Sequence, residues 1–71
     1  MTNHERVMEF MRRDPSRTYT ASEIAAEIWG EKDRHRRVGT AGKVLVQAQK
    51  YGFVECIGTD DNGVRVWRLV A

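Results

Sequence analysis

The sequence predicts a small α+β domain in the order helix, strand, helix, helix, strand, strand. Three segments have apolar residues at spacings of three and four, as amphipathic helices do. The C-terminal third has two β-prone runs separated by a turn rich in Asp, Asn and Gly, which is the pattern of a β-hairpin. A chain of 71 residues has the length of one domain, so we expect residues 1–71 to form a single unit with a thin core.

The first segment predicts a helix over residues 3–13 and a minor strand over residues 17–19. Its apolar face comprises Val7, Phe10 and Met11, with Met8 as a further candidate. Pro15 ends the helix, because proline disfavours the helical conformation in the residue before it. The residues that follow are short and β-prone, which favours an edge strand at 17–19.

A second helix is predicted over residues 21–29. Thr20 and Glu23 have the spacing of a capping box, in which the hydroxyl and the carboxylate each accept a hydrogen bond from a backbone N–H at the helix start. The apolar face of this helix comprises Ile24, Ala25 and Ile28. Gly30 is free to adopt a conformation that ends it.

A third helix is predicted to end near residue 51, and two starts are open. Its inward face comprises Val38, Ala41, Leu45 and Ala48. The helix begins either at residue 34, with Asp33 as cap, or at about residue 40, with Thr40 as cap. Gly39 and Gly42 favour the shorter helix, because each costs up to about 1 kcal/mol inside a helix.

The C-terminal residues predict a hairpin with strands over 53–58 and 64–70. In the second strand Arg65, Trp67 and Leu69 share one face, since side chains alternate along a strand. We expect Trp67 and Leu69 to close the core.

Four short segments support a more specific interpretation. They are Ser22-Glu23-Ile24-Ala25, Val44-Leu45, Lys50-Tyr51-Gly52-Phe53-Val54 and Val66-Trp67-Arg68-Leu69. With the order of elements, they resemble the winged helix-turn-helix family along nearly the whole chain. The resemblance implies that the third helix is a recognition helix, which enters the major groove of DNA, and that the hairpin is the wing.

Positive charge is concentrated in residues 32–50. This segment has six basic residues against Asp33 alone, a formal charge of +5, whereas both flanking segments are net negative. Successive residues of a helix are 100° apart, so the third predicted helix has a polar face opposite its apolar, inward face. That face comprises Arg36, Thr40, Lys43, Gln47 and Lys50. These side chains suit phosphates and base edges, and a nearby glycine, Gly39 or Gly42, lets the backbone approach a phosphate closely.

We therefore expect sequence-specific binding of double-stranded DNA by a small transcriptional regulator. The expected DNA-binding residues are Arg34, Arg36, Arg37, Thr40, Lys43, Gln47, Lys50, Arg65 and Arg68. For Arg34 to Arg37, ion pairing with Glu27, Glu31 and Asp33 is an equal alternative to phosphate contact.

One feature weighs against contacts between the wing tip and DNA. Asp60 and Asp61 at the wing tip would repel phosphate, so the tip is better interpreted as a turn chosen for its backbone chemistry.

The alternative function is a protein-interaction module or a homodimerising accessory protein that uses exposed Trp29, Val44 and Val46.

Other classes of function find no support in the sequence. His4, His35 and Cys56 are too few and too scattered for a zinc site, and no nucleophile motif or phosphate-binding glycine loop is present. We therefore expect that the protein is not an enzyme and binds no metal, cofactor or small-molecule ligand. A single cysteine, no apolar run near the roughly 20 residues of a membrane span and no secretory signal predict a cytoplasmic protein without membrane contact.

Overall fold

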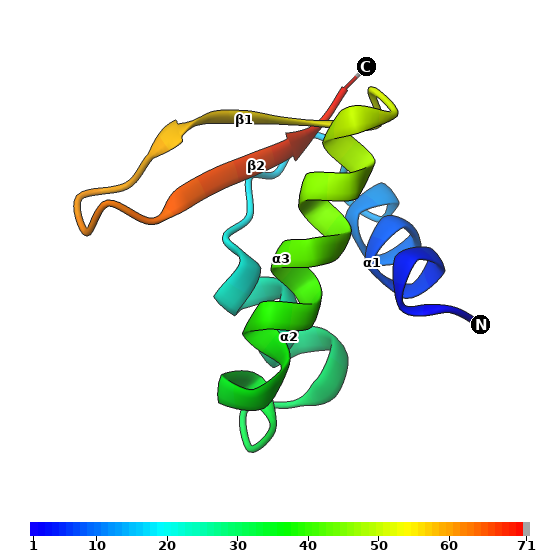
Figure 1. Cartoon of the computed structure of the whole chain (residues 1–71), viewed down its shortest axis with the longest axis vertical. Coiled ribbons are helices and arrows are strands. Elements are labelled where there is room, and N and C mark those ends of the chain that lie inside the picture. Colours follow the sequence, from blue (N-terminus) through cyan, green and yellow to red (C-terminus); the bar gives the residue numbers. More distant parts are fainter. Residues whose placement is uncertain (71) are drawn as a thin grey trace.

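The computed structural model describes residues 1–70 and shows three helices followed by an antiparallel hairpin, a topology consistent with a winged helix (Figure 1). The elements are α1 (Asn3–Arg12), α2 (Ala21–Trp29), α3 (Arg34–Lys50), β1 (Val54–Thr59) and β2 (Arg65–Leu69). In Figure 1 the hairpin extends to the left from the C-terminal end of α3, α1 lies to the right of that helix, and α2 lies behind its N-terminal half. Ala71, the last residue of the expected domain, lies outside the described residues.

Helix α1 begins with a complete capping box. The Thr2 hydroxyl accepts a hydrogen bond from the Glu5 backbone N–H (3.1 Å), and the Glu5 carboxylate accepts one from the Thr2 backbone N–H (3.2 Å). The backbone hydrogen bond from Thr2 is the main cause that lowers the pKa of the Glu5 carboxyl. The helix ends at Arg12, one residue earlier than predicted, and buries Val7 and Met11 together with Met8.

Helix α2 has the predicted bounds, but only half of the predicted capping box. The Thr20 hydroxyl accepts from the Glu23 backbone N–H at 3.2 Å, as expected. The Glu23 carboxylate accepts from the Thr20 hydroxyl (3.3 Å) and from the Arg17 guanidinium (3.4 Å) instead of from the Thr20 backbone. A charged donor close to the helix start therefore replaces the reciprocal backbone bond.

The predicted strand over residues 17–19 is absent. Tyr19 alone pairs with Trp67, through hydrogen bonds of 2.8 Å from its N–H to the Trp67 carbonyl and 2.7 Å in return. Thr20 already caps α2, so the chain turns into that helix after one paired residue.

The Arg17 side chain contacts Glu27 at 3.0 Å and lies 4.7 Å above the centre of the Tyr19 ring. Burial of that ring raises the pKa of the Tyr19 phenol.

Helix α3 begins at Arg34, so the longer of the two alternatives is found and the preference for the shorter helix is wrong. Asp33 holds the N-cap position without a side-chain hydrogen bond. Contacts with α2 and the loop before α3 stabilise the first turn. Arg34 donates to the Ser22 hydroxyl (3.0 Å) and pairs with Glu31 (2.9 Å), and Arg37 lies over the ring of Trp29. Val38, which lies in the added turns, also packs against the core, and this burial together with those contacts favours the longer helix despite the two glycines.

Gly39 now lies inside a helix, which leads to a prediction about stability. A Cβ at this position meets no atom of the described residues within 4 Å. Gly39→Ala should therefore raise the free energy of unfolding by about 0.5–1 kcal/mol through helix propensity alone. Thermal denaturation followed by circular dichroism should show an increase in Tm of about 2–8 °C.

Gly63 provides a matched control for that substitution. Its surroundings are equally open, but its φ is +79°, a conformation that alanine adopts only with strain. Gly63→Ala should lower the Tm. If both alanine variants shift the Tm in the same direction, the explanation by backbone conformation is wrong.

The hairpin pairs β1 and β2 with one irregularity. The register aligns Val54 with Leu69 and Cys56 with Trp67, and a bulge at Ile57 then shifts it so that Gly58 faces Val66. Trp67 is 3% exposed and Leu69 packs partly buried against the core, which confirms that both close it. The core they close comprises Val7, Met8, Met11, Tyr19, Ile24, Ala25, Ala41, Val44, Leu45, Ala48, Val54 and Trp67.

Candidate nucleic-acid interface

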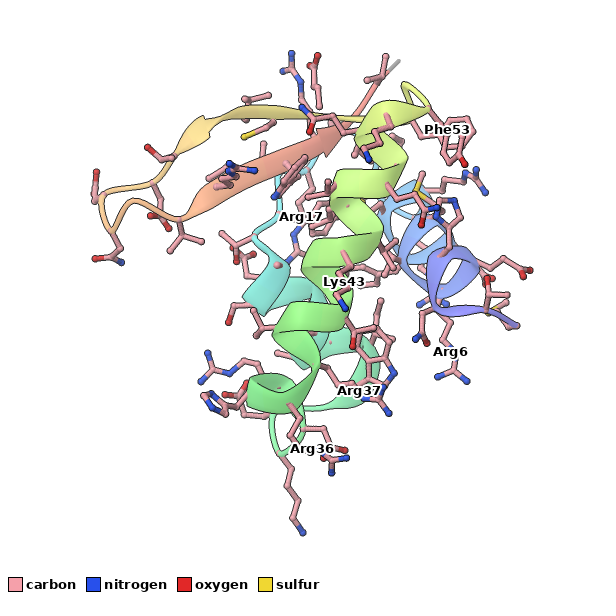
Figure 2. All side chains as sticks on the ribbon, viewed as in Figure 1. Arg6, Arg17, Arg36, Arg37, Lys43 and Phe53 are labelled. Carbon is pink, nitrogen blue, oxygen red and sulfur yellow. The ribbon has the colours of Figure 1, made fainter. Side chains whose placement is uncertain are left out.

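The polar face of α3, defined as Arg36, Thr40, Lys43, Gln47 and Lys50, points away from the body of the domain. Four of its members are exposed and Thr40 is half-buried. On the opposite side of the same helix Ala41, Leu45 and Ala48 are fully buried. Lys43 accordingly projects outward from the middle of α3 in Figure 2. Packing of the apolar side thus fixes which side chains face solvent.

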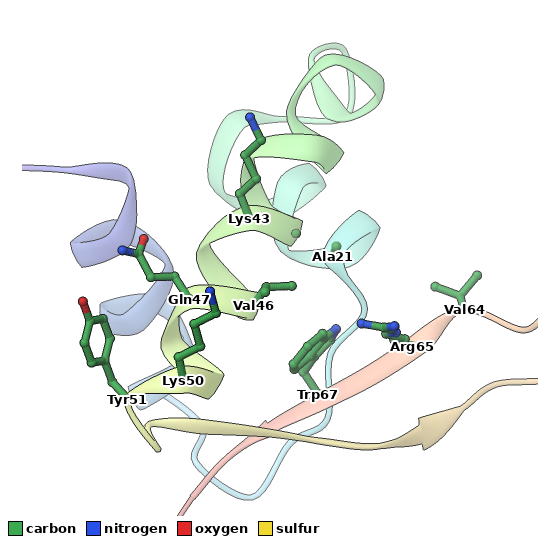
Figure 3. A pocket seen from close by; sticks show the side chains of 10 residues that line it. Ala21, Lys43, Val46, Gln47, Lys50, Tyr51, Val64, Arg65 and Trp67 are labelled. Carbon is green, nitrogen blue, oxygen red and sulfur yellow. The ribbon is translucent and has the colours of Figure 1, made fainter.

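An open groove of about 700 Å³ lies between α3 and β2 (Figure 3). We call it the α3–β2 groove. Its lining comprises Ala21, Gly42, Lys43, Val46, Gln47, Lys50, Tyr51, Val64, Arg65 and Trp67. Lys43 and Lys50 come from one wall and Arg65 from the other, with Val46 and Trp67 between them in Figure 3. Within residues 1–70 the lining contains no carboxylate, so the groove is apolar in its middle and positive at its edges.

The three basic groups of this groove are available to a ligand. Within residues 1–70, neither Lys43, Lys50 nor Arg65 lies within 4 Å of a carboxylate oxygen. An anion that enters the groove therefore displaces water rather than an existing ion pair. This arrangement favours a ligand with several negative charges.

The basic residues at the N-terminal end of α3 have partners already. Arg34 pairs with Glu31 at 2.9 Å and Arg36 with Asp33 at 3.8 Å, as one of the two alternatives predicted. Glu27, the third expected partner, pairs with Arg17 instead. All these pairs are exposed, so each contributes little stability and exchanges readily for another anion.

The two arginines of β2 lie on opposite faces of the hairpin. Arg65 lines the α3–β2 groove, whereas Arg68 lies across from Glu55 and donates a hydrogen bond of 2.6 Å to its carboxylate. The structure thus brings Lys43, Gln47, Lys50 and Arg65 together. It places Arg34, Arg36, Arg37 and Arg68 outside the groove, with Thr40 one turn of α3 before Lys43.

The acidic wing tip forms a turn, as predicted. The Asp60 carboxylate accepts hydrogen bonds from the backbone N–H groups of Asn62 (2.9 Å) and Val64 (3.0 Å). Backbone bonds between Asp60 and Val64, and between Gly63 and Asp60, close the same turn. These hydrogen bonds to the turn backbone account for an aspartate at position 60.

The sequence predicted only part of the groove lining, and it predicted the wrong burial for one valine. Val44 is buried at 8% exposure, so the expectation that it is exposed is wrong, whereas Val46 is 41% exposed and lines the groove. Trp29 is half-buried beneath Arg37. Ala21 reaches the groove from α2 and Val64 from the turn before β2, and no periodicity within α3 indicates them.

Comparison of the chain with protein-family models, with curated proteins and with solved structures finds no match. Among residues 1–70, no helix is both long and apolar enough to cross a membrane. The same residues bring no three His, Cys, Asp or Glu side chains together in a group that could hold a metal ion.

Proposed function

We propose that this chain is a winged helix-turn-helix domain that binds double-stranded DNA sequence-specifically, as a small transcriptional regulator. The observation that supports this most is the α3–β2 groove, where three basic groups with no carboxylate partner among residues 1–70 flank an exposed helix face. Helix α3 has 17 residues and is thus about 25 Å long, and the major groove of B-DNA is wide enough to admit an α-helix.

The groove residues take different roles in this proposal. Lys43, Lys50 and Arg65 bind phosphates, which supplies affinity without sequence preference. Gln47 contacts a base edge, because its amide matches the donor and acceptor of adenine in the major groove. The polar face of α3 also presents Arg36 and Thr40 to the same side, for contacts further along the duplex. No enzymatic activity, cofactor or membrane contact forms part of the proposal.

Salt dependence tests the proposal directly. The protein is titrated into a labelled random duplex of about 20 base pairs, and fluorescence anisotropy is measured at several salt concentrations. Three phosphates neutralised in the groove give a log–log slope of about −3, and further contacts extend it toward −6. Absence of binding at low salt contradicts the proposal.

The two arginines of β2 make a matched pair for a second test. Arg65→Ala should weaken duplex binding several-fold and make the salt slope shallower by about 1, because a groove cation is lost. Arg68→Ala should leave affinity within about twofold, because that side chain lies on the other face beside Glu55. Equal losses in both variants would show that the groove is not the DNA-binding surface.

A protein-interaction module or homodimer is the second candidate. Its specific support is an exposed aromatic pair after α3, Tyr51 (64% exposed) and Phe53 (45% exposed), with ring centres 6.0 Å apart. Of Trp29, Val44 and Val46, the residues that the sequence suggested for such a contact, only Val46 is exposed, at 41%. Light scattering, duplex titration and a pull-down together distinguish the two functions: a strict monomer that binds no duplex but captures a protein favours this candidate.

A further inference from the structure

Val46 is an apolar residue within the part of α3 that the proposed function places against DNA. At 100° per residue, positions 43, 46, 47 and 50 fall within an arc of about 100°. Lys43, Gln47 and Lys50 occupy the other three positions. In Figure 3 the Val46 side chain projects into the α3–β2 groove, on the side that faces Trp67.

Neither helix formation nor core packing explains a valine at this position. Valine is a weaker helix former than alanine or a long polar side chain. Val46 remains 41% exposed, whereas Val44 on the buried side is 8% exposed and contributes to the core. The apolar surface of Val46 therefore faces whatever enters the groove.

In the major groove of DNA, the apolar group at the base edges is the C5-methyl of thymine. We infer that Val46 contacts a thymine methyl, and that the domain consequently prefers sites with an A·T pair at this point of the groove. Gln47, the next residue, suits adenine, so neighbouring positions on α3 favour the same class of base pair. The inference rests on the proposed function, binding of duplex DNA through α3.

The experiment compares thymine with uracil, which retains every hydrogen-bonding group and lacks only the methyl. Duplexes that the wild-type protein prefers are first enriched from a randomised pool, and each thymine of the best site is then replaced by deoxyuridine. We expect one position at which the replacement raises Kd about fourfold, which corresponds to about 0.8 kcal/mol for one buried methyl group. Val46→Ala should reduce the difference at that position to less than twofold.

Val70→Ala is the matched control. Val70 is 46% exposed and lies outside the α3–β2 groove, so its loss should preserve the fourfold difference between thymine and uracil. Circular dichroism of both variants checks that the fold is retained.

Two results would overturn the inference. If the wild-type protein binds selected duplexes with equal Kd for thymine and uracil at every position, or if Val46→Ala keeps the difference, the methyl contact is wrong while DNA binding stands. If the wild-type protein binds no duplex, the proposed function fails and the inference fails with it.

Discussion

Replacing Trp67 by alanine is expected to unfold most of the protein at 25 °C. Trp67 is 3% exposed in the core, and removal of a buried tryptophan side chain costs about 3–5 kcal/mol. A domain of this size rarely gains more than about 3–5 kcal/mol from its core, so the substitution removes most of the available stability. Far-UV circular dichroism at 25 °C, together with urea denaturation, should show loss of the cooperative transition.

Trp29→Ala is the control for this prediction, because it removes the same side chain from a half-buried position on α2. That variant loses the contact with Arg37 but should retain a cooperative transition. A Trp67→Ala variant that melts within a few degrees of the wild type would show that the hairpin is not part of the cooperative core.

Lys43→Glu is expected to weaken duplex binding at 0.1 M salt by at least about tenfold. The substitution removes one of the three groove cations that have no carboxylate partner in the described part of the chain, and it introduces a charge of the same sign as phosphate. Each 1.4 kcal/mol of lost binding free energy is tenfold in Kd. The log–log salt slope should also become shallower by about 1. Anisotropy titrations at several salt concentrations measure both quantities.

Arg6→Glu changes the net charge by the same amount and serves as the control. Arg6 lines a separate hollow between α1 and α2, which shares no lining residue with the α3–β2 groove. Its substitution should alter Kd by less than about threefold, since separated surface charges are screened at this salt concentration. If both variants lose equal affinity, binding responds to total charge and not to the groove.

Local patterns predicted the helices and the hairpin well, because each is determined mainly by nearby residues. The Thr20 cap and Gly30 bracket α2 as expected, and alternation along β2 identified Trp67 and Leu69 as inward-facing. Side-chain periodicity likewise separated the buried and polar sides of α3. These features depend on spacing within one element.

The predictions from sequence that were wrong or incomplete concern features that depend on contacts between elements. The start of α3 depends on Arg34 bonding Ser22 and on Arg37 stacking over Trp29, partners on another helix. Residues 17–19 have β-prone side chains, but the cap at Thr20 leaves only Tyr19 to pair. The groove itself needs α2, α3 and β2 together, so the sequence predicted its basic residues without showing that Arg65 belongs to it and Arg68 does not.

The backbone pairing of Tyr19 with Trp67 has a thermodynamic consequence for association. Tyr19 directly precedes the cap of α2, and α2 packs along α3, so this pair adds a backbone link between β2 and the two helices to the packing of Trp67 and Leu69 in the core. Lys43 and Arg65 are thereby positioned on opposite walls before any ligand arrives. Fixing the backbone of a loose residue costs about 1–2 kcal/mol, and a preorganised hairpin largely avoids that cost on binding.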